Sequence, residues 1–136
     1  MNAAPRSGAA HDDEEVAMSL KVCLAGATGW AGSELARGIA ATDDLKLVGA
    51  MARRHAGQKL GDVLGEGGLD ATISASAAEA LAQRCDVFVE YTHPDSAKAN
   101  ILAALEHGAH VVVGTSGLTD EDYAQIDAVA RERQRG

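Results

Sequence analysis

The sequence has 136 residues, a formal net charge of −8 and 3% aromatic side chains. This length accommodates one compact domain, and 46% hydrophobic with 24% charged residues excludes collagen-like, coiled-coil and fully disordered proteins. Twenty acidic residues against twelve basic ones leave no strongly basic surface for a nucleic acid, and no apolar run is long enough to span a membrane.

Residues 1–18 contain a proline, a glycine and an acidic run, with neither strand nor helix periodicity. We therefore predict a disordered leader at 1–18 and a single domain at 19–136. The first twenty residues lack the continuous apolar centre of a signal peptide, so we expect a cytoplasmic protein. Cys23 and Cys85 each lie beside short apolar runs, which favours buried free thiols over a disulfide.

The first half of the domain predicts a strand, a turn, a helix and a second strand. An apolar run at Val22–Ala25 ends in a glycine, and apolar residues then recur at helical spacing over 31–40. A second apolar run, Leu45–Met51, follows a short polar turn. The glycine-rich segment Arg53–Asp70 predicts a loop.

The second half continues the alternation of strands and helices. The predicted elements are a minor strand at 71–74, a short helix at 77–83, a strand at 86–91, a helix at 94–107, a strand at 110–113 and a final helix that begins after Thr119. The main strand runs are continuously apolar, as strands buried on both faces require. The order predicts a doubly wound α/β domain with a mainly parallel sheet.

A glycine-rich turn connects the first strand to the first helix. Its glycines have the spacing G-x-x-G-x-x-G, a relative of the G-x-G-x-x-G fingerprint, which lets a pyrophosphate approach a helix N-terminus. A tight turn without a ligand is the alternative. The candidate cofactor-binding residues of this turn are Gly26, Thr28, Gly29, Trp30, Ala31 and Gly32.

Two arginines, Arg53 and Arg54, follow the second strand, where an NAD-selective site would carry an acidic residue. Asp43 and Asp44 precede that strand and should lie at its other end. Two guanidinium groups suit a 2′-phosphate, so we expect NADPH as cofactor, with NADH possible. The alternative is a solvated arginine pair.

The loops after the next two strands carry small hydroxyl side chains and should lie at the same edge of the sheet as the glycine turn. That edge is where ligands bind, so we predict a nicotinamide and substrate pocket there. The candidates are Tyr91, Thr92, His93, Gly114 and Thr115 for the cofactor and Ser116 and Gly117 for the substrate. No set of His, Cys or carboxylates has a metal-ligand spacing, so no metal site is expected.

At these residues the sequence resembles the N-terminal cofactor domain of the dihydrodipicolinate reductases, also called 4-hydroxy-tetrahydrodipicolinate reductases. The resemblance runs from about Lys21 to Arg135 and is most specific at Tyr91–Pro94 and Gly114–Gly117. It implies an NADPH-dependent oxidoreductase of lysine and diaminopimelate biosynthesis that reduces a cyclic dicarboxylate, as a homotetramer. It also implies a second domain carrying the catalytic His and Lys, so no catalytic residue is expected in this chain.

Several positions depart from that family's pattern. Glu90 and Tyr91 stand where Asp and Phe are usual, and Ser116 replaces a Thr that contacts substrate. Arg53 replaces the acidic residue that many members carry, which shifts the expected cofactor toward NADPH.

Two alternatives remain open from the sequence. Residues 26–35 are also similar to the opening of N-acetyl-glutamyl-phosphate reductases and aspartate-semialdehyde dehydrogenases, which bind NADP. The chain could also act as a non-catalytic module that senses a dinucleotide.

Overall fold

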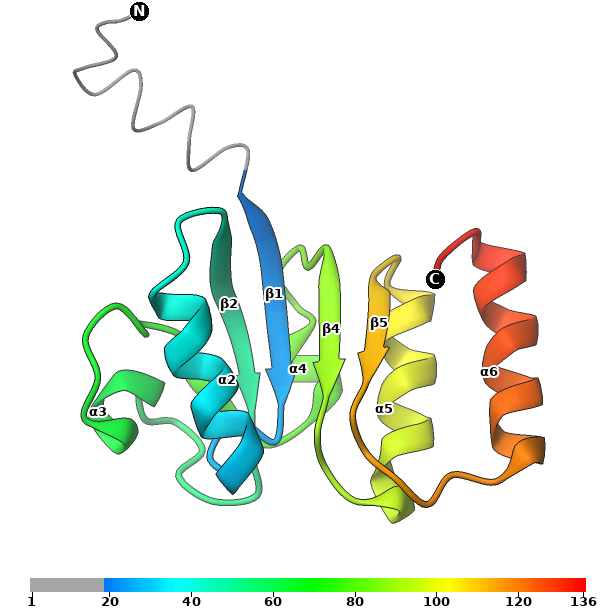
Figure 1. Ribbon diagram of the computed structural model, residues 1–136, viewed down its shortest axis with the longest axis horizontal. Coiled ribbons are helices and arrows are strands. Elements are labelled where there is room, and N and C mark those ends of the chain that lie inside the picture. The colour runs from blue at the N-terminus through cyan, green and yellow to red at the C-terminus, as the bar shows by residue number, and fades with distance from the viewer. Residues whose placement is uncertain (1–18) are drawn as a thin grey trace, which may run out of the picture.

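The computed structural model describes residues 19–136 as a five-stranded parallel sheet with helices on both faces (Figure 1). The predicted leader lies outside the described residues. The strand order is β3-β2-β1-β4-β5, and every pairing is parallel. The strands are β1 (Leu20–Ala25), β2 (Leu45–Met51), β3 (Ile73–Ser74), β4 (Val87–Glu90) and β5 (His110–Val113).

The helices divide between the two faces of the sheet. Their bounds are α2 (Trp30–Ala40), α3 (Leu60–Leu64), α4 (Ala77–Ala80), α5 (Pro94–Glu106) and α6 (Asp120–Arg133). Side chains of α2 and α3 pack against one face of β1 and β2, whereas those of α4 and α5 pack against the other face. Helix α6 packs on α5 and extends the second layer outward. The predicted doubly wound parallel architecture is confirmed.

Three sequence predictions about single elements need correction. The predicted loop 53–70 contains α3, whose first residue, Leu60, is fully buried in the core. The short helix after β3 ends at Ala80 instead of residue 83. Strand β5 is not buried on both faces, because it is an edge strand and Val112 remains 54% exposed.

Both cysteines are buried free thiols, as the sequence predicts. The Cys23 thiol donates a hydrogen bond to the Ala80 carbonyl at 3.4 Å, and the Cys85 thiol donates to the Val87 carbonyl at 3.1 Å. A hydrogen bond with Cys85, together with burial, raises the pKa of Cys23 far above its usual range. Such a thiol packs as a small apolar group.

Helix α6 has no buried residue, but its partly buried apolar side chains pack against the buried apolar residues of α5. Its N-terminus carries a capping box, in which the Thr119 hydroxyl accepts from the Asp122 amide and the Asp122 carboxylate accepts from the Thr119 amide, both at 3.0 Å. Those hydrogen bonds, and Lys98 of α5 at 3.4 Å, lower the pKa of Asp122. Arg133 pairs with Glu106 at 2.8 Å across the two helices.

The turn after β1 lies in close contact with both the start of α2 and the loop after β4. Gly26 has φ +85°, and a Cβ there would lie 2.1 Å from the Tyr91 carbonyl oxygen. A Cβ on Gly32 would lie 1.9 Å from the Gly26 carbonyl oxygen. Only glycine at both positions allows α2 to begin directly beside the end of β1.

We therefore expect Gly32→Ala to destabilise the fold by about 1–3 kcal/mol, as for other overpacked sites. The measurement is the urea midpoint of unfolding. Gly38→Ala is the matched control, because it lies in the same helix and its added methyl meets no atom within 4 Å. That control should gain about 0.5–1 kcal/mol from helix propensity. Equal midpoints for the two variants would contradict the close approach at Gly32.

Candidate functional site

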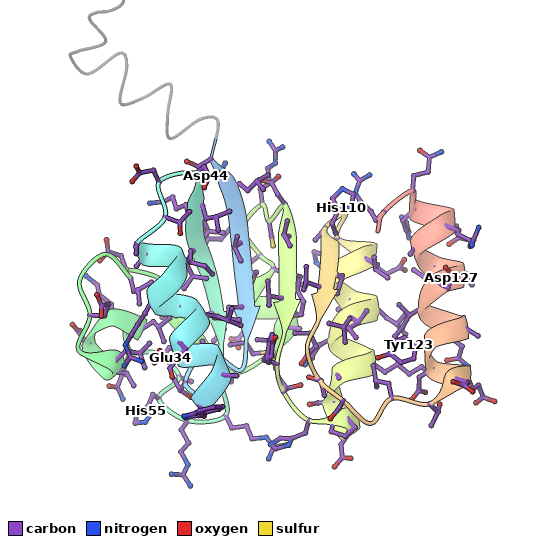
Figure 2. The ribbon with its side chains drawn as sticks, in the orientation of Figure 1. Glu34, Asp44, His55, His110, Tyr123 and Asp127 are labelled. Carbon is purple, nitrogen blue, oxygen red and sulfur yellow. The ribbon has the colours of Figure 1, made fainter. Side chains whose placement is uncertain are left out.

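A cavity of about 570 Å³ lies at the carboxyl edge of the sheet. Its walls come from the turns that follow β1, β2 and β4, together with the start of α5. Figure 2 shows His55, which follows the arginine pair, at the edge of the sheet opposite to Asp44. The lining residues are Gly26, Thr28, Gly29, Trp30, Met51, Ala52, Arg53, Arg54, Ala75, Tyr91, Thr92, His93 and Ser96.

The N-terminus of α2 faces this cavity without a side-chain cap. Gly29 is the N-cap residue; its amide donates to the Gly26 carbonyl at 3.0 Å and its carbonyl accepts from Ser33 at 2.8 Å. Among the described residues, the amides of the next three residues, 30–32, have no backbone partner. Free amides and the helix dipole together form a site for an anion.

The arginine pair at the end of β2 is available to a ligand. Arg53 and Arg54 are both exposed, and within 19–136 neither makes a hydrogen bond or an ion pair. No acidic residue of the described range 19–136 lines the cavity. Asp44 immediately precedes β2 at the opposite edge, as the sequence predicts. The two guanidinium groups therefore form a local cationic surface on a chain that is acidic overall.

The aromatic ring of Tyr91 lies on the loop after β5. A Cβ on Gly114 would lie 2.1–2.4 Å from three ring carbons of Tyr91, so only glycine fits beneath the ring. A backbone hydrogen bond fixes the start of each loop to the neighbouring strand: the Tyr91 amide donates to Ala25 of β1 at 3.0 Å, and the Gly114 amide donates to Glu90 of β4 at 2.8 Å. The ring thus forms a fixed, half-buried wall of the cavity.

Glu90, the last residue of β4, is fully buried and has no role in the sequence predictions beyond a departure from a pattern. Its carboxylate accepts hydrogen bonds from the Thr92 amide at 2.7 Å and from the Thr92 hydroxyl. It also accepts from the Thr115 hydroxyl at 3.2 Å and the Asn100 side-chain amide at 3.0 Å. One carboxylate therefore joins the loops after β4 and β5. A charged residue ending an apolar strand is the sequence signal that could have identified it.

The structure brings most of the predicted site residues together, but not all of them. Ala31, Gly32, Gly114, Thr115, Ser116 and Gly117 do not line the cavity. Ser116 is exposed and makes no hydrogen bond to residues 19–136, whereas Gly117 packs against Pro94. The sequence predictions did not include four lining residues: Met51, Ala52, Ala75 and Ser96.

Residues 19–136 contain neither a metal-binding cluster nor a membrane-spanning helix. No group of three or more His, Cys, Asp or Glu side chains in that range could hold a metal ion. Likewise, no helix in the described part of the chain has the length and apolar character needed to cross a membrane.

Comparison with known proteins identifies the family. Residues 20–135 match the family model described as dihydrodipicolinate reductase, N-terminus. The 4-hydroxy-tetrahydrodipicolinate reductase of Geobacillus kaustophilus is 33% identical over 120 residues, which cover 88% of this chain and 45% of the relative. The chain thus spans a little under half the length of that relative.

Solved structures show the same fold. Dihydrodipicolinate reductase of Paenisporosarcina sp. TG-14, bound to dipicolinate, superposes with a TM-score of 0.70 at 22% identity over 86% of this chain and 45% of that one. Biliverdin reductase of Synechocystis sp. PCC 6803, in complex with biliverdin and NADP⁺, superposes with a TM-score of 0.69 at 24% identity. The match covers 85% of this chain and 36% of that one. The resemblance predicted from the two loop motifs is confirmed: the chain belongs to the dihydrodipicolinate reductase family and corresponds to its N-terminal part.

Proposed function

We propose that this chain is the NADPH-binding part of a 4-hydroxy-tetrahydrodipicolinate reductase. The observation that carries the proposal is the uncapped N-terminus of α2, which shares one cavity with two arginines that have no partner among the described residues. The complete enzyme would reduce the cyclic dihydrodipicolinate precursor to tetrahydrodipicolinate in lysine and diaminopimelate biosynthesis. We further propose that it does so in the cytoplasm, as a homotetramer.

Each part of the dinucleotide has a proposed position in the cavity. The free amides of residues 30–32 would hold the pyrophosphate, and Arg53 and Arg54 would hold the 2′-phosphate. Tyr91, Thr92 and His93 would border the nicotinamide. Trp30, which is 91% exposed at the cavity wall, offers an aromatic face to the ligand. When bound, the cofactor supplies the hydride.

The substrate would lie beyond the nicotinamide, near Ser116 and Gly117 in the loop after β5. Binding a dicarboxylate requires cationic donors, and protonating the product requires an acid within hydrogen-bond reach. His93 is the single imidazole in the cavity wall, and it is exposed with no hydrogen-bonded side chain to orient it among residues 19–136. We therefore assign the catalytic groups to the part of the family's chain that this sequence does not cover.

Cofactor preference tests the arginine assignment. A charge-assisted hydrogen bond contributes about 1.5–3 kcal/mol, so two guanidiniums should make NADPH bind at least about tenfold more tightly than NADH. Arg53→Glu should remove most of that preference, because it places a negative charge beside the 2′-phosphate. Calorimetric titration of both cofactors gives the two dissociation constants.

The matched control is Arg84→Glu, which makes the same charge change at an arginine that is 79% exposed and does not line the cavity. This control should leave the preference for NADPH over NADH unchanged. The comparison then distinguishes a direct contact with the 2′-phosphate from an effect of the chain's net charge. Equal dissociation constants for NADPH and NADH in the unaltered chain would refute the assignment.

A further inference from the structure

The Glu90 side chain accepts four hydrogen bonds from the described residues. Oε1 accepts from the Thr92 amide, the Thr92 hydroxyl and the Thr115 hydroxyl, and Oε2 accepts from Asn100. Glu90 is fully buried, and within residues 19–136 no cation pairs with it. A buried side chain with four hydrogen-bond donors around it holds its neighbours in one arrangement, because any rotation leaves a buried group unpaired.

This arrangement fixes the direction of two hydroxyl groups. A threonine hydroxyl has one hydrogen to donate and two lone pairs. Both Thr92 and Thr115 give that hydrogen to Glu90. Thr115 is buried, and its oxygen also accepts from the Thr92 amide at 2.9 Å. Thr92 is half-buried on the cavity wall, and its oxygen lies 3.2 Å from the Ser96 hydroxyl, which must then be the donor of that pair. The Thr92 hydroxyl therefore has no hydrogen left for the cavity and offers it the remaining lone pair.

We propose that Glu90 is a positioning residue that makes Thr92 an obligatory hydrogen-bond acceptor at the nicotinamide end of the cavity. The inference rests on the proposed function. The ligand group at Thr92 must then carry an N–H or O–H, which the nicotinamide carboxamide and its ribose both do. A carboxylate or phosphate oxygen would face the lone pairs of Thr92 and is excluded from that position.

The first test compares NADP⁺ with its 3-acetylpyridine analogue, which lacks the carboxamide N–H. Thr92→Val should weaken binding of NADP⁺ by about five- to tenfold, as for one lost hydrogen bond. Binding of the analogue should stay unchanged if the carboxamide is the donor and weaken equally if a ribose hydroxyl is. Thr92→Ser keeps the hydroxyl and should restore binding. Thr42→Val, at an exposed threonine outside the cavity, is the control.

The second test addresses Glu90 itself. In Glu90→Gln the amide oxygen can keep all three contacts of Oε1 while Asn100 turns its own amide, so the ratio of NADP⁺ to analogue affinity should be retained. Glu90→Met removes the acceptor and frees the Thr92 hydroxyl to rotate, so the affinities for both ligands should fall to those of Thr92→Val. If Glu90 acts through Thr92, adding Glu90→Met to Thr92→Val should weaken binding no further, whereas a general loss of packing would add to the effect of Thr92→Val.

A third measurement is made on the unaltered chain with no ligand added, so it does not depend on whether a variant folds. In the unaltered chain, the hydroxyl protons of Thr92 and Thr115 should exchange slowly with water and be visible by NMR. Rapid exchange of both protons would overturn the arrangement around Glu90, and equal binding of NADP⁺ by Thr92→Val and the unaltered chain would overturn the acceptor role. Failure of the unaltered chain to bind any dinucleotide would instead contradict the proposed function. The exchange rates of the two hydroxyl protons would then still test the arrangement around Glu90.

Discussion

Replacement of Gly29 by valine should abolish NADPH binding and leave a folded protein. Gly29 has φ −73°, which valine adopts without strain, and a Cβ there would meet only the Gly26 carbonyl oxygen, at 3.3 Å. The added methyl groups would instead occupy the space in front of the free amides of residues 30–32. Two lost charge-assisted hydrogen bonds cost at least about 3 kcal/mol, which is more than a hundredfold in affinity.

Calorimetry measures the affinity, and circular dichroism with thermal unfolding shows whether the variant folds. Gly38→Val is the control, because it is the same substitution in the same helix at a position where a Cβ meets nothing within 4 Å. That variant should bind NADPH like the unaltered chain. Unchanged affinity in Gly29→Val would place the pyrophosphate elsewhere and remove the main support for a dinucleotide site.

The isolated chain should bind NADPH but not oxidise it in the presence of the dihydrodipicolinate precursor. Hydride transfer needs a substrate held at near-attack distance, and a misplacement of about 1 Å already costs about a hundredfold in rate. Of the residues that the structure describes, the cavity wall includes Thr92 and one imidazole, His93, with no paired Lys and His. We expect the same sequence, joined to the C-terminal part of a family member, to turn over.

The rate of NADPH oxidation is measured as loss of NADPH absorbance. The substrate is supplied by the synthase that forms the dihydrodipicolinate precursor. The paired binding measurement distinguishes a missing catalytic group from a missing cofactor. Robust turnover by the isolated chain would show that Thr92, His93 or Ser116 does more than hold ligands, and would require a different assignment of the catalytic groups.

The order of elements could be predicted because it depends on local patterns. Apolar runs at 22–25 and 45–51 and the glycine spacing at 26–32 specify strand, turn and helix without reference to distant residues. Helix α3 was missed because glycines surround it and its only buried anchor, Leu60, is defined by tertiary packing. The exposure of Val112 was missed because a position at the sheet edge is a property of strand order, which periodicity does not encode.

The site was predicted to a similar extent and for similar reasons. The glycine turn, Arg53, Arg54 and Tyr91–His93 follow strand ends, and a parallel sheet brings strand ends to one edge. Glu90 and Asn100 lie ten residues apart on different elements, so their contact could not be read from spacing. Ser116 lies outside the cavity because the lining comes from the segments after β1, β2, β3 and β4 and not from the loop after the edge strand β5.

Helix α6 has no buried residue, so we expect its free energy of local unfolding to be lower than that of the sheet. We expect the amides of core strands such as β1 to exchange only through global unfolding. Helix α6 is held by partly buried apolar contacts, a capping box and surface ion pairs, so it should open locally at a lower free energy. The depressed pKa of Asp122 means that its contribution is present above the pKa of the unfolded chain and is lost as pH falls through the folded value. We therefore expect acid to loosen α6 before the sheet, and because no residue of α6 lines the cavity, this opening should leave the candidate site intact.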